Sequence, residues 1–162
     1  MKLYKSKIKL FDRFTIFDRK GNNSPYLTRY RIIDTPWFGV FVHQMHRPDA
    51  SPILHDHPWA FVSFVLRGGY IERYKDMSDL TDAQVHVRRI NHFNLKRLRD
   101  AHYISMLDRT PTWTLVFVGA TERVWGYWER GTNEGWYRTI WHEHINHAPG
   151  LDYESEIRSA GA

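Results

Sequence analysis

The feature that most constrains the fold is a close succession of short segments rich in valine, isoleucine and aromatic residues. Glycine, proline and aspartate separate these segments, and no amphipathic helical stretch follows residue 20. This spacing is typical of an all-β sandwich or barrel and disfavours a helical or α/β protein. The expected strands are 38–46, 59–66, 70–74, 84–89, 92–95, 102–107, 112–118, 123–129 and 136–141.

Two consecutive glycines suggest how a pair of these strands is joined. The run at 59–66 ends just before Gly68 and Gly69, and the next run begins at once at residues 70–74. Two alternating strands joined by so short a turn favour a β-hairpin. We therefore expect these two strands to pair directly with each other.

Chain length and the distribution of polar residues indicate one folded domain with extensions at both ends. We expect an N-terminal arm at 1–25, a β domain at 26–148 and a flexible C-terminal tail at 149–162. In the arm, Ile8 and Phe11 would lie on one side of a short helix, although the hydrophobic period there is poor.

Composition excludes several classes of protein. Aromatic residues make up 15% of the chain, which is enough to anchor a core, so overall disorder is excluded. No apolar run approaches the roughly 20 residues that span a bilayer, so no membrane partner is expected. The first residues lack the apolar segment of a signal peptide. Cysteine is absent, which excludes disulfides and thiolate ligands and leads us to expect a cytoplasmic location.

The net charge of +5 is mildly basic and comes from 23 Lys and Arg against 18 Asp and Glu. A protein that binds nucleic acid usually gathers such charge into a patch. Here the densest basic stretches are only Arg88-Arg89 and residues 96–99. A solvated surface explains this distribution better than a nucleic-acid partner, while an anionic small ligand stays open.

Ten histidines are a more unusual feature, because histidine is the commonest metal ligand. His55 and His57 flank Asp56 just before the strand expected at 59–66. Residues i and i+2 of an extended chain point to the same face, so both imidazoles can reach one metal ion. The alternative is that both histidines are ordinary polar residues of a turn.

The first motif of the cupin superfamily, H-x-H followed by a glutamate and then a glycine, is similar to residues 55–69, HDHPWAFVSFVLRGG. The resemblance covers residues 37–130 and implies a jelly-roll barrel, the cupin double-stranded β-helix. The family's glutamate would fall at Phe61 or Val62, and neither can bind metal. The family's second motif supplies another histidine, for which His102 is the best candidate; a core histidine is the alternative.

A group of short cupin-like proteins from bacteria and phages resembles the chain more closely than any characterised enzyme does. The shared stretches are TPWFG at 35–39, HDHPW at 55–59, LRGGY at 66–70, WTL at 113–115 and RVWGY at 123–127. This resemblance supports the fold and the metal site and implies no substrate.

Three neutral imidazoles without a carboxylate resemble the metal site of the thiol dioxygenases. The resemblance implies a divalent metal on His55, His57 and His102, with Fe(II) first and Zn, Ni or Mn as alternatives. It also implies a small-molecule oxidoreductase with dioxygenase-like chemistry. Because residue 57 is histidine rather than a carboxylate, we disfavour an oxoglutarate-dependent hydroxylase.

Three charged residues are candidates for contact with an anionic small-molecule substrate. Arg67 precedes the two glycines and Arg99 precedes His102 by three residues. An arginine fork can hold an anion through two hydrogen bonds. Glu72 follows the glycines and would face the interior as a late ligand, a general base or a substrate contact. Surface charge is the alternative for each of these three residues.

Two other functions stay open. One is a sugar or sugar-nucleotide isomerase or epimerase, which the arginine and tryptophan content would suit. The other is a non-enzymatic module for ligand sensing or interaction, because the cupin fold hosts all of these functions. The resemblance also implies a homodimer formed through an edge strand or the N-terminal arm.

Overall fold

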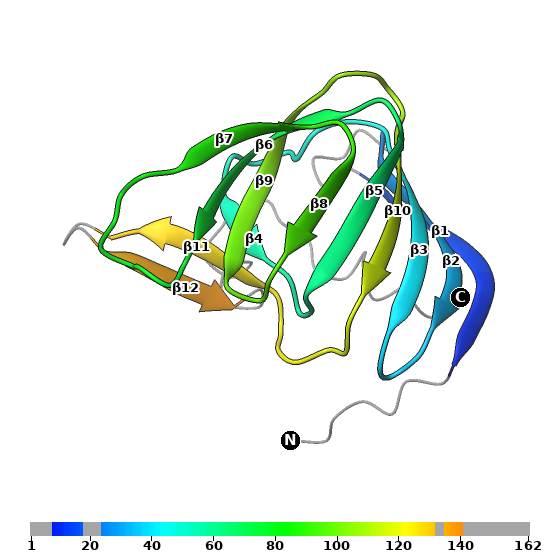
Figure 1. The fold of residues 1–162 in the computed structure, drawn as a ribbon, viewed down its shortest axis with the longest axis horizontal. Helices are drawn as coiled ribbons and strands as arrows, with labels where there is room; N and C mark the ends of the chain where they lie inside the picture. The colour runs from blue at the N-terminus through cyan, green and yellow to red at the C-terminus, as the bar shows by residue number, and fades with distance from the viewer. Residues whose placement is uncertain (1–7, 18–23, 132–134, 141–162) are drawn as a thin grey trace.

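A computed structural model describes residues 8–17, 24–131 and 135–140, and this part of the chain folds entirely into strands and connecting loops (Figure 1). No helix that could span a membrane occurs among these residues. The strands are β1 (Lys9–Phe17), β2 (Pro25–Asp34), β3 (Gly39–Met45), β4 (Leu54–Asp56), β5 (Phe61–Arg67), β6 (Tyr70–Asp76), β7 (His86–Ile90), β8 (Phe93–Lys96), β9 (Asp100–Leu107), β10 (Thr112–Val118), β11 (Gly126–Arg130) and β12 (Trp136–Ile140).

The strands form two six-stranded sheets that face each other. The first sheet has the order β1-β2-β3-β10-β5-β8, and the second has the order β12-β11-β4-β9-β6-β7. Figure 1 shows β1, β2, β3 and β10 side by side in the first sheet, with β11 and β12 at the far edge of the second. Every pairing between the described strands is antiparallel. The prediction of an all-β protein is confirmed, and the architecture is a jelly roll.

The hairpin predicted at the two glycines is wrong. β5 belongs to the first sheet and β6 to the second, so the chain crosses from one sheet to the other at this point. Gly68 has a φ of 87°, in the left-handed region that favours glycine. A Cβ at Gly68 would also lie 2.7 Å from the hydroxyl oxygen of Thr112. The glycine therefore allows a sharp corner between sheets rather than a turn within one sheet.

The N-terminal arm contributes a strand, so the short helix predicted for it is wrong. β1 pairs with β2 from Lys9 opposite Asp34 to Phe17 opposite Pro25. A paired strand satisfies backbone groups that an isolated short helix would leave exposed to water at its ends. The predicted tail at 149–162 lies outside the described residues.

Apolar residues from both sheets meet in the interior. Leu27 and Met45 of the first sheet pack against Tyr70 and Ile90 of the second. This contact fixes which face of β2 and β3 points into the barrel. A second buried cluster, around Leu54, extends the core along the second sheet.

Strand β8 has an inverted pattern, with polar residues inside and apolar residues outside, and β5 and β10 also bury polar residues. On β8, Phe93 and Leu95 are 63% and 52% exposed, whereas Asn94 and Lys96 are 1% exposed. Ser63 on β5 is likewise buried. A buried polar side chain is costly unless it is hydrogen-bonded. The interior of this barrel is therefore built around a polar site as well as an apolar core.

Candidate metal centre

The short strand β4 brings the first histidine into the barrel. Strand β4 lies between β11 and β9. His55 is paired with Tyr127 of β11 on one side and with His102 of β9 on the other. His57 follows directly after the end of β4. Residues His55 and His57 therefore share a face, as the H-x-H spacing predicts, and His102 joins them from the neighbouring strand.

The three imidazoles converge on one small volume. One nitrogen from each of His55, His57 and His102 lies within 4.8 Å of the others, and the Nε2 atoms of His57 and His102 are 2.8 Å apart. Two nitrogens bound to one divalent metal at about 2.1 Å lie roughly 3.0–3.4 Å apart when they are adjacent ligands. The donor set therefore fits a single metal ion with small side-chain movements. The cluster contains no carboxylate.

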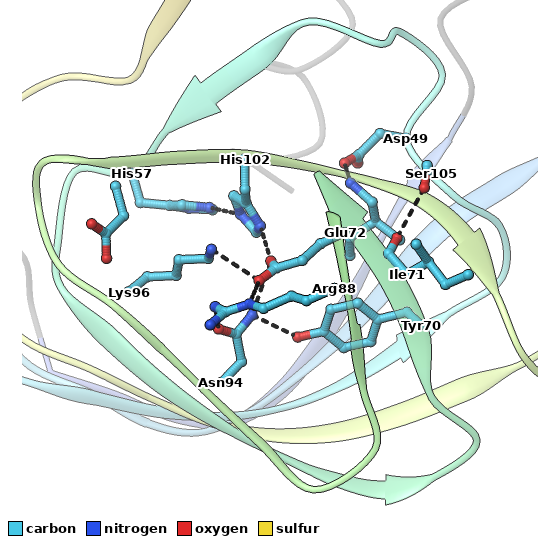
Figure 2. Close-up of polar contacts among 12 residues, drawn as sticks. Asp49, His57, Tyr70, Ile71, Glu72, Arg88, Asn94, Lys96, His102 and Ser105 are labelled. Carbon is cyan, nitrogen blue, oxygen red and sulfur yellow. Dashed lines mark hydrogen bonds and ion pairs between the residues drawn. The ribbon is translucent and has the colours of Figure 1, made fainter. Parts of the chain in front are cut away.

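Glu72 on β6 lies behind His102 and is completely buried. Its Oε2 lies 2.8 Å from Nδ1 of His102 and also accepts a hydrogen bond from Asn94, at 3.0 Å. Its Oε1 accepts hydrogen bonds from Arg88 at 2.6 Å and Lys96 at 3.0 Å. Figure 2 shows this carboxylate at the centre of the network, with His57 on the far side of His102.

The network around Glu72 determines which nitrogen of His102 is free. Burial alone raises the pKa of Glu72, but the hydrogen bond from His102 and the charges of His102, Lys96 and Arg88 hold it well below its usual range. Glu72 is therefore a carboxylate that can only accept, so Nδ1 of His102 carries the proton. This leaves the Nε2 lone pair of His102 facing His57, the arrangement that metal-binding histidines commonly have.

Burial keeps the imidazoles of His57 and His102 neutral. It lowers the pKa of His102 to about 4, although the hydrogen bond to Glu72 acts in the opposite direction. Burial also holds the pKa of His57 well below 6.5, and positive charge on His102, His55, Arg29 and Lys96 would lower it further. Neutral imidazole is the form that binds metal, so neither histidine has to lose a proton at neutral pH.

Asp56, between the two histidines of the motif, faces the opposite way and anchors β4. It is completely buried, and its carboxylate accepts two hydrogen bonds from Arg138, at 2.7 and 2.9 Å. The indole of Trp128 donates a third at 2.8 Å, and Arg123 lies 3.4 Å away. The same short strand thus places His55 and His57 on one side and a charged anchor on the other.

Aromatic side chains enclose the histidines. The ring centre of Trp125 lies 4.4 Å from that of His57, and the ring centre of Phe61 lies 4.8 Å from it. Tyr127 and Trp125 also lie beside His55, at 6.2 and 5.8 Å between ring centres. These walls lower the local dielectric and restrict access by water, which strengthens electrostatic interactions at the site.

The three residues predicted to contact substrate lie in different places. Glu72 is buried behind His102 with both oxygens engaged, so it faces the histidine rather than open space. Arg67 is exposed at the far end of β5, about 20 Å along the strand from Phe61. Arg99 lies near the start of β9, where it forms an ion pair with Asp76 and is half exposed. It borders a shallow hollow with Ala60. The structure does not bring Arg67 or Arg99 into the histidine cluster.

The anchoring roles of Glu72 and Asp56 are missed by the sequence reading. The sequence does contain a signal for the burial of Glu72. Glu72 is two residues from Tyr70, so the two side chains share one face of β6, and both are buried. No local pattern in the sequence indicates that Asp56 pairs with Arg138, which lies more than eighty residues further along the chain.

Comparisons with known proteins identify the fold. No family model matches the sequence, and no curated protein matches it. The solved structure of Fe(II) HppE aligns over 67% of this chain and 56% of that chain, with a TM-score of 0.51 and 15% identity. Streptomyces albus HEPD, with 2-hydroxyethylphosphonate and Fe(II) bound, aligns over 68% and 24% at a TM-score of 0.49 and 14% identity. CapF from Staphylococcus aureus aligns over 78% and 34% at 0.49 and 15% identity.

The alignment with HppE, together with the sheet order, defines the fold. The chain is an all-β jelly roll with the cupin fold. It spans about half the length of HppE. At this level of identity the likeness extends to the fold, and the site has to be argued from the residues of this chain.

Proposed function

We propose that the chain is a metal-dependent oxidoreductase that acts on a small molecule. In this proposal His55, His57 and His102 hold one divalent metal ion, and Fe(II) is the metal. The observation that carries the proposal is the convergence of three imidazole nitrogens, without a carboxylate, inside a barrel closed by aromatic rings. Imidazole ligands suit iron, and HppE, which shares the fold, was solved with Fe(II).

The residues of the chain supply positioning and a dry environment. Glu72 holds the Nδ1 proton of His102 and so keeps Nε2 directed at the site. Phe61 and Trp125 exclude water from one side of the histidines. A bound Fe(II) would supply Lewis acidity and one-electron chemistry with O₂, and three neutral ligands would leave its double positive charge uncompensated. An anionic substrate is therefore favoured over a neutral one.

The test is the metal content of protein purified without oxygen, measured by mass spectrometry. The variants are His55→Ala and, as a control, His92→Ala, an exposed histidine outside the cluster. We expect close to one equivalent of iron in the wild type and in the control, and none in His55→Ala. Oxygen consumption with thiols, diketones and amino acids would follow.

Other results would redirect or overturn the proposal. One equivalent of zinc or nickel in place of iron would favour the isomerase or epimerase alternative, which needs no O₂. Absence of metal from the wild type after supply of iron would show that the histidines are structural. A ligand-sensing or interaction module would then be the better explanation.

A further inference from the structure

Arg29 on β2 is a cation that points into the barrel. It stands opposite His43 of β3, two positions along from Leu27, whose partner Met45 is part of the core shared by the two sheets. Because side chains alternate along a strand, Arg29 shares the inner face with Leu27. Most of the surface of Arg29 is buried, but part of it is still exposed to solvent.

The described contacts of Arg29 are with a neutral histidine and two aromatic rings. Its Nε donates to Nε2 of His43 at 3.0 Å, and its guanidinium lies over the rings of Phe14 and Phe41 at 5.5 and 5.3 Å. Burial and the charge of Arg29 hold the pKa of His43 well below 6.5, so His43 is a neutral acceptor. A guanidinium has five N–H donors, and this hydrogen bond uses one of them.

The neighbouring Arg31 shows the usual way in which such a charge is neutralised. Arg31 forms ion pairs with Asp12 and Asp34, two carboxylates within reach of its guanidinium. Among the described residues no carboxylate forms an ion pair with Arg29, and the charge of Asp34 acts on it only from beyond ion-pair distance. Burial lowers the pKa of Arg29 to about 10, so the group is still charged at neutral pH. A charge in such a place is costly unless it is paired.

Arg29 and Lys96 are both cations of the first sheet whose side chains enter the interior between the two sheets. Lys96 is paired with Glu72, 3.0 Å away, whereas no carboxylate of the described residues forms an ion pair with Arg29. The interior of the barrel therefore carries a positive charge at Arg29 that no described ion pair neutralises.

We propose that Arg29 is the anion-binding residue of the site and holds an oxyanion, a carboxylate or a phosphate group, of the small molecule that the barrel receives. The proposal rests on the proposed function and deepens it, because it assigns a substrate class to the histidine site.

The planar guanidinium of arginine can hold a carboxylate or a phosphate group through two parallel hydrogen bonds. The bound oxyanion supplies the missing counter-charge, and the aromatic rings beneath the guanidinium keep the fork in place. The proposal adds Arg29 to Arg67 and Arg99, which stay predicted substrate contacts.

The test measures anion binding to metal-free protein by isothermal titration, so that metal coordination cannot contribute. The probes are inorganic phosphate and benzoate, with benzamide as the uncharged analogue of benzoate. We expect the wild type to bind at least one oxyanion and to prefer benzoate to benzamide. Arg29→Gln should weaken binding by about 10-fold or more, the effect of losing hydrogen bonds to a charged group. Arg31→Gln is the matched control and should bind like the wild type, and Arg67→Gln and Arg99→Gln are measured beside it.

Three results would overturn the proposal: no binding of either oxyanion to the wild type, unchanged binding in Arg29→Gln, or loss in Arg67→Gln or Arg99→Gln alone. If Arg29→Gln does not fold, the guanidinium resonances of Arg29 in the wild type decide instead. These resonances should shift when phosphate or benzoate is added, and no shift would contradict the proposal. Iron content of Arg29→Gln, measured separately, should equal that of the wild type. Failure of the metal proposal would therefore be visible without affecting the anion result.

Discussion

The carboxylate of Glu72 lies 2.8 Å from Nδ1 of His102, and the opposite nitrogen of the same ring lies 2.8 Å from Nε2 of His57. The buried carboxylate of Glu72 thus orients the ring of His102, whose opposite nitrogen faces the place where a metal would bind. The acid itself is fixed by Lys96 and Arg88. This chain of contacts runs across both sheets, because Lys96 lies on β8 and Glu72 on β6.

Glu72→Gln should weaken metal binding while the histidines stay in place. The amide lacks the charge that holds the Nδ1 proton of His102, so the ring orientation is less strictly determined. Loss of such a partner typically lowers metal affinity by about 10- to 100-fold. Competition with a chelator measures this change. The control is Glu122→Gln, an exposed glutamate in a loop. Equal affinity in the two variants would contradict the positioning role of Glu72.

Asp56→Asn should destabilise the fold far more than a matched change on the surface. The asparagine would leave Arg138 and Arg123, each less than a third exposed, beside a neutral group. Removing one partner of a buried ion pair costs about 3–5 kcal/mol, and we expect a loss near the lower end. Denaturant unfolding measures it. Asp76→Asn, which breaks the exposed pair with Arg99, should cost less than about 1 kcal/mol. Similar losses in both variants would rule out the anchoring role.

Stability of the metal-free protein should fall as the pH is lowered from about 6.5 toward 4. The pKa of His102 is about 4 in the folded protein and near 6.5 in an unfolded chain, so the unfolded state binds more protons between these values. The stability contributed by neutral His102 is complete above pH 6.5 and is lost as the pH falls to the folded value. The low pKa of His57 acts in the same direction. The slope is at most about 1.4 kcal/mol per pH unit for each histidine.

Denaturant unfolding across this pH range checks the expectation. Replacing the exposed His92 by glutamine should leave the profile unchanged, because His92 lies outside the buried cluster. A stability that is constant between pH 6.5 and 4 would show that His57 and His102 are not held neutral by burial.

Gly68→Ala should lower the melting temperature, and Gly119→Ala should not. At Gly68 the backbone is left-handed, and a Cβ would lie 2.7 Å from the hydroxyl of the fully buried Thr112. The left-handed conformation alone costs a non-glycine residue about 1–2 kcal/mol. At Gly119 the nearest atom to a new Cβ is the carbonyl oxygen of Ala60, at an ordinary 3.6 Å. Equal melting temperatures for the two variants would contradict the need for glycine at this corner.

Strand content was predictable from the sequence because it depends on local composition. Nine of the observed strands, from β3 and from β5 to β12, overlap segments whose alternation or valine and aromatic content indicated them. Strands β1, β2 and β4 were not predicted. β4 has only three residues, and β1 acquires its conformation by pairing with β2. Such pairing is a long-range contact that a local pattern does not encode.

The wrong prediction of a hairpin at Gly68 has a physical cause. A run of residues shows which positions alternate, but not which sheet a strand joins. The same limit applies to β8, where Phe93 and Leu95 lie outside and Asn94 and Lys96 inside. Alternation predicts two faces, and only the neighbouring strands decide which face is the interior.

By itself the sequence determined that the chain is all-β and that His55 and His57 share a face, because a period of two and an i, i+2 spacing are local consequences of an extended backbone. Resemblance between motifs added His102. Tertiary structure alone decided that Glu72 lies behind His102 and that Arg29 points into the same barrel and contacts His43. These relationships join residues tens of positions apart, and their energies depend on burial, which exists only once the two sheets have packed.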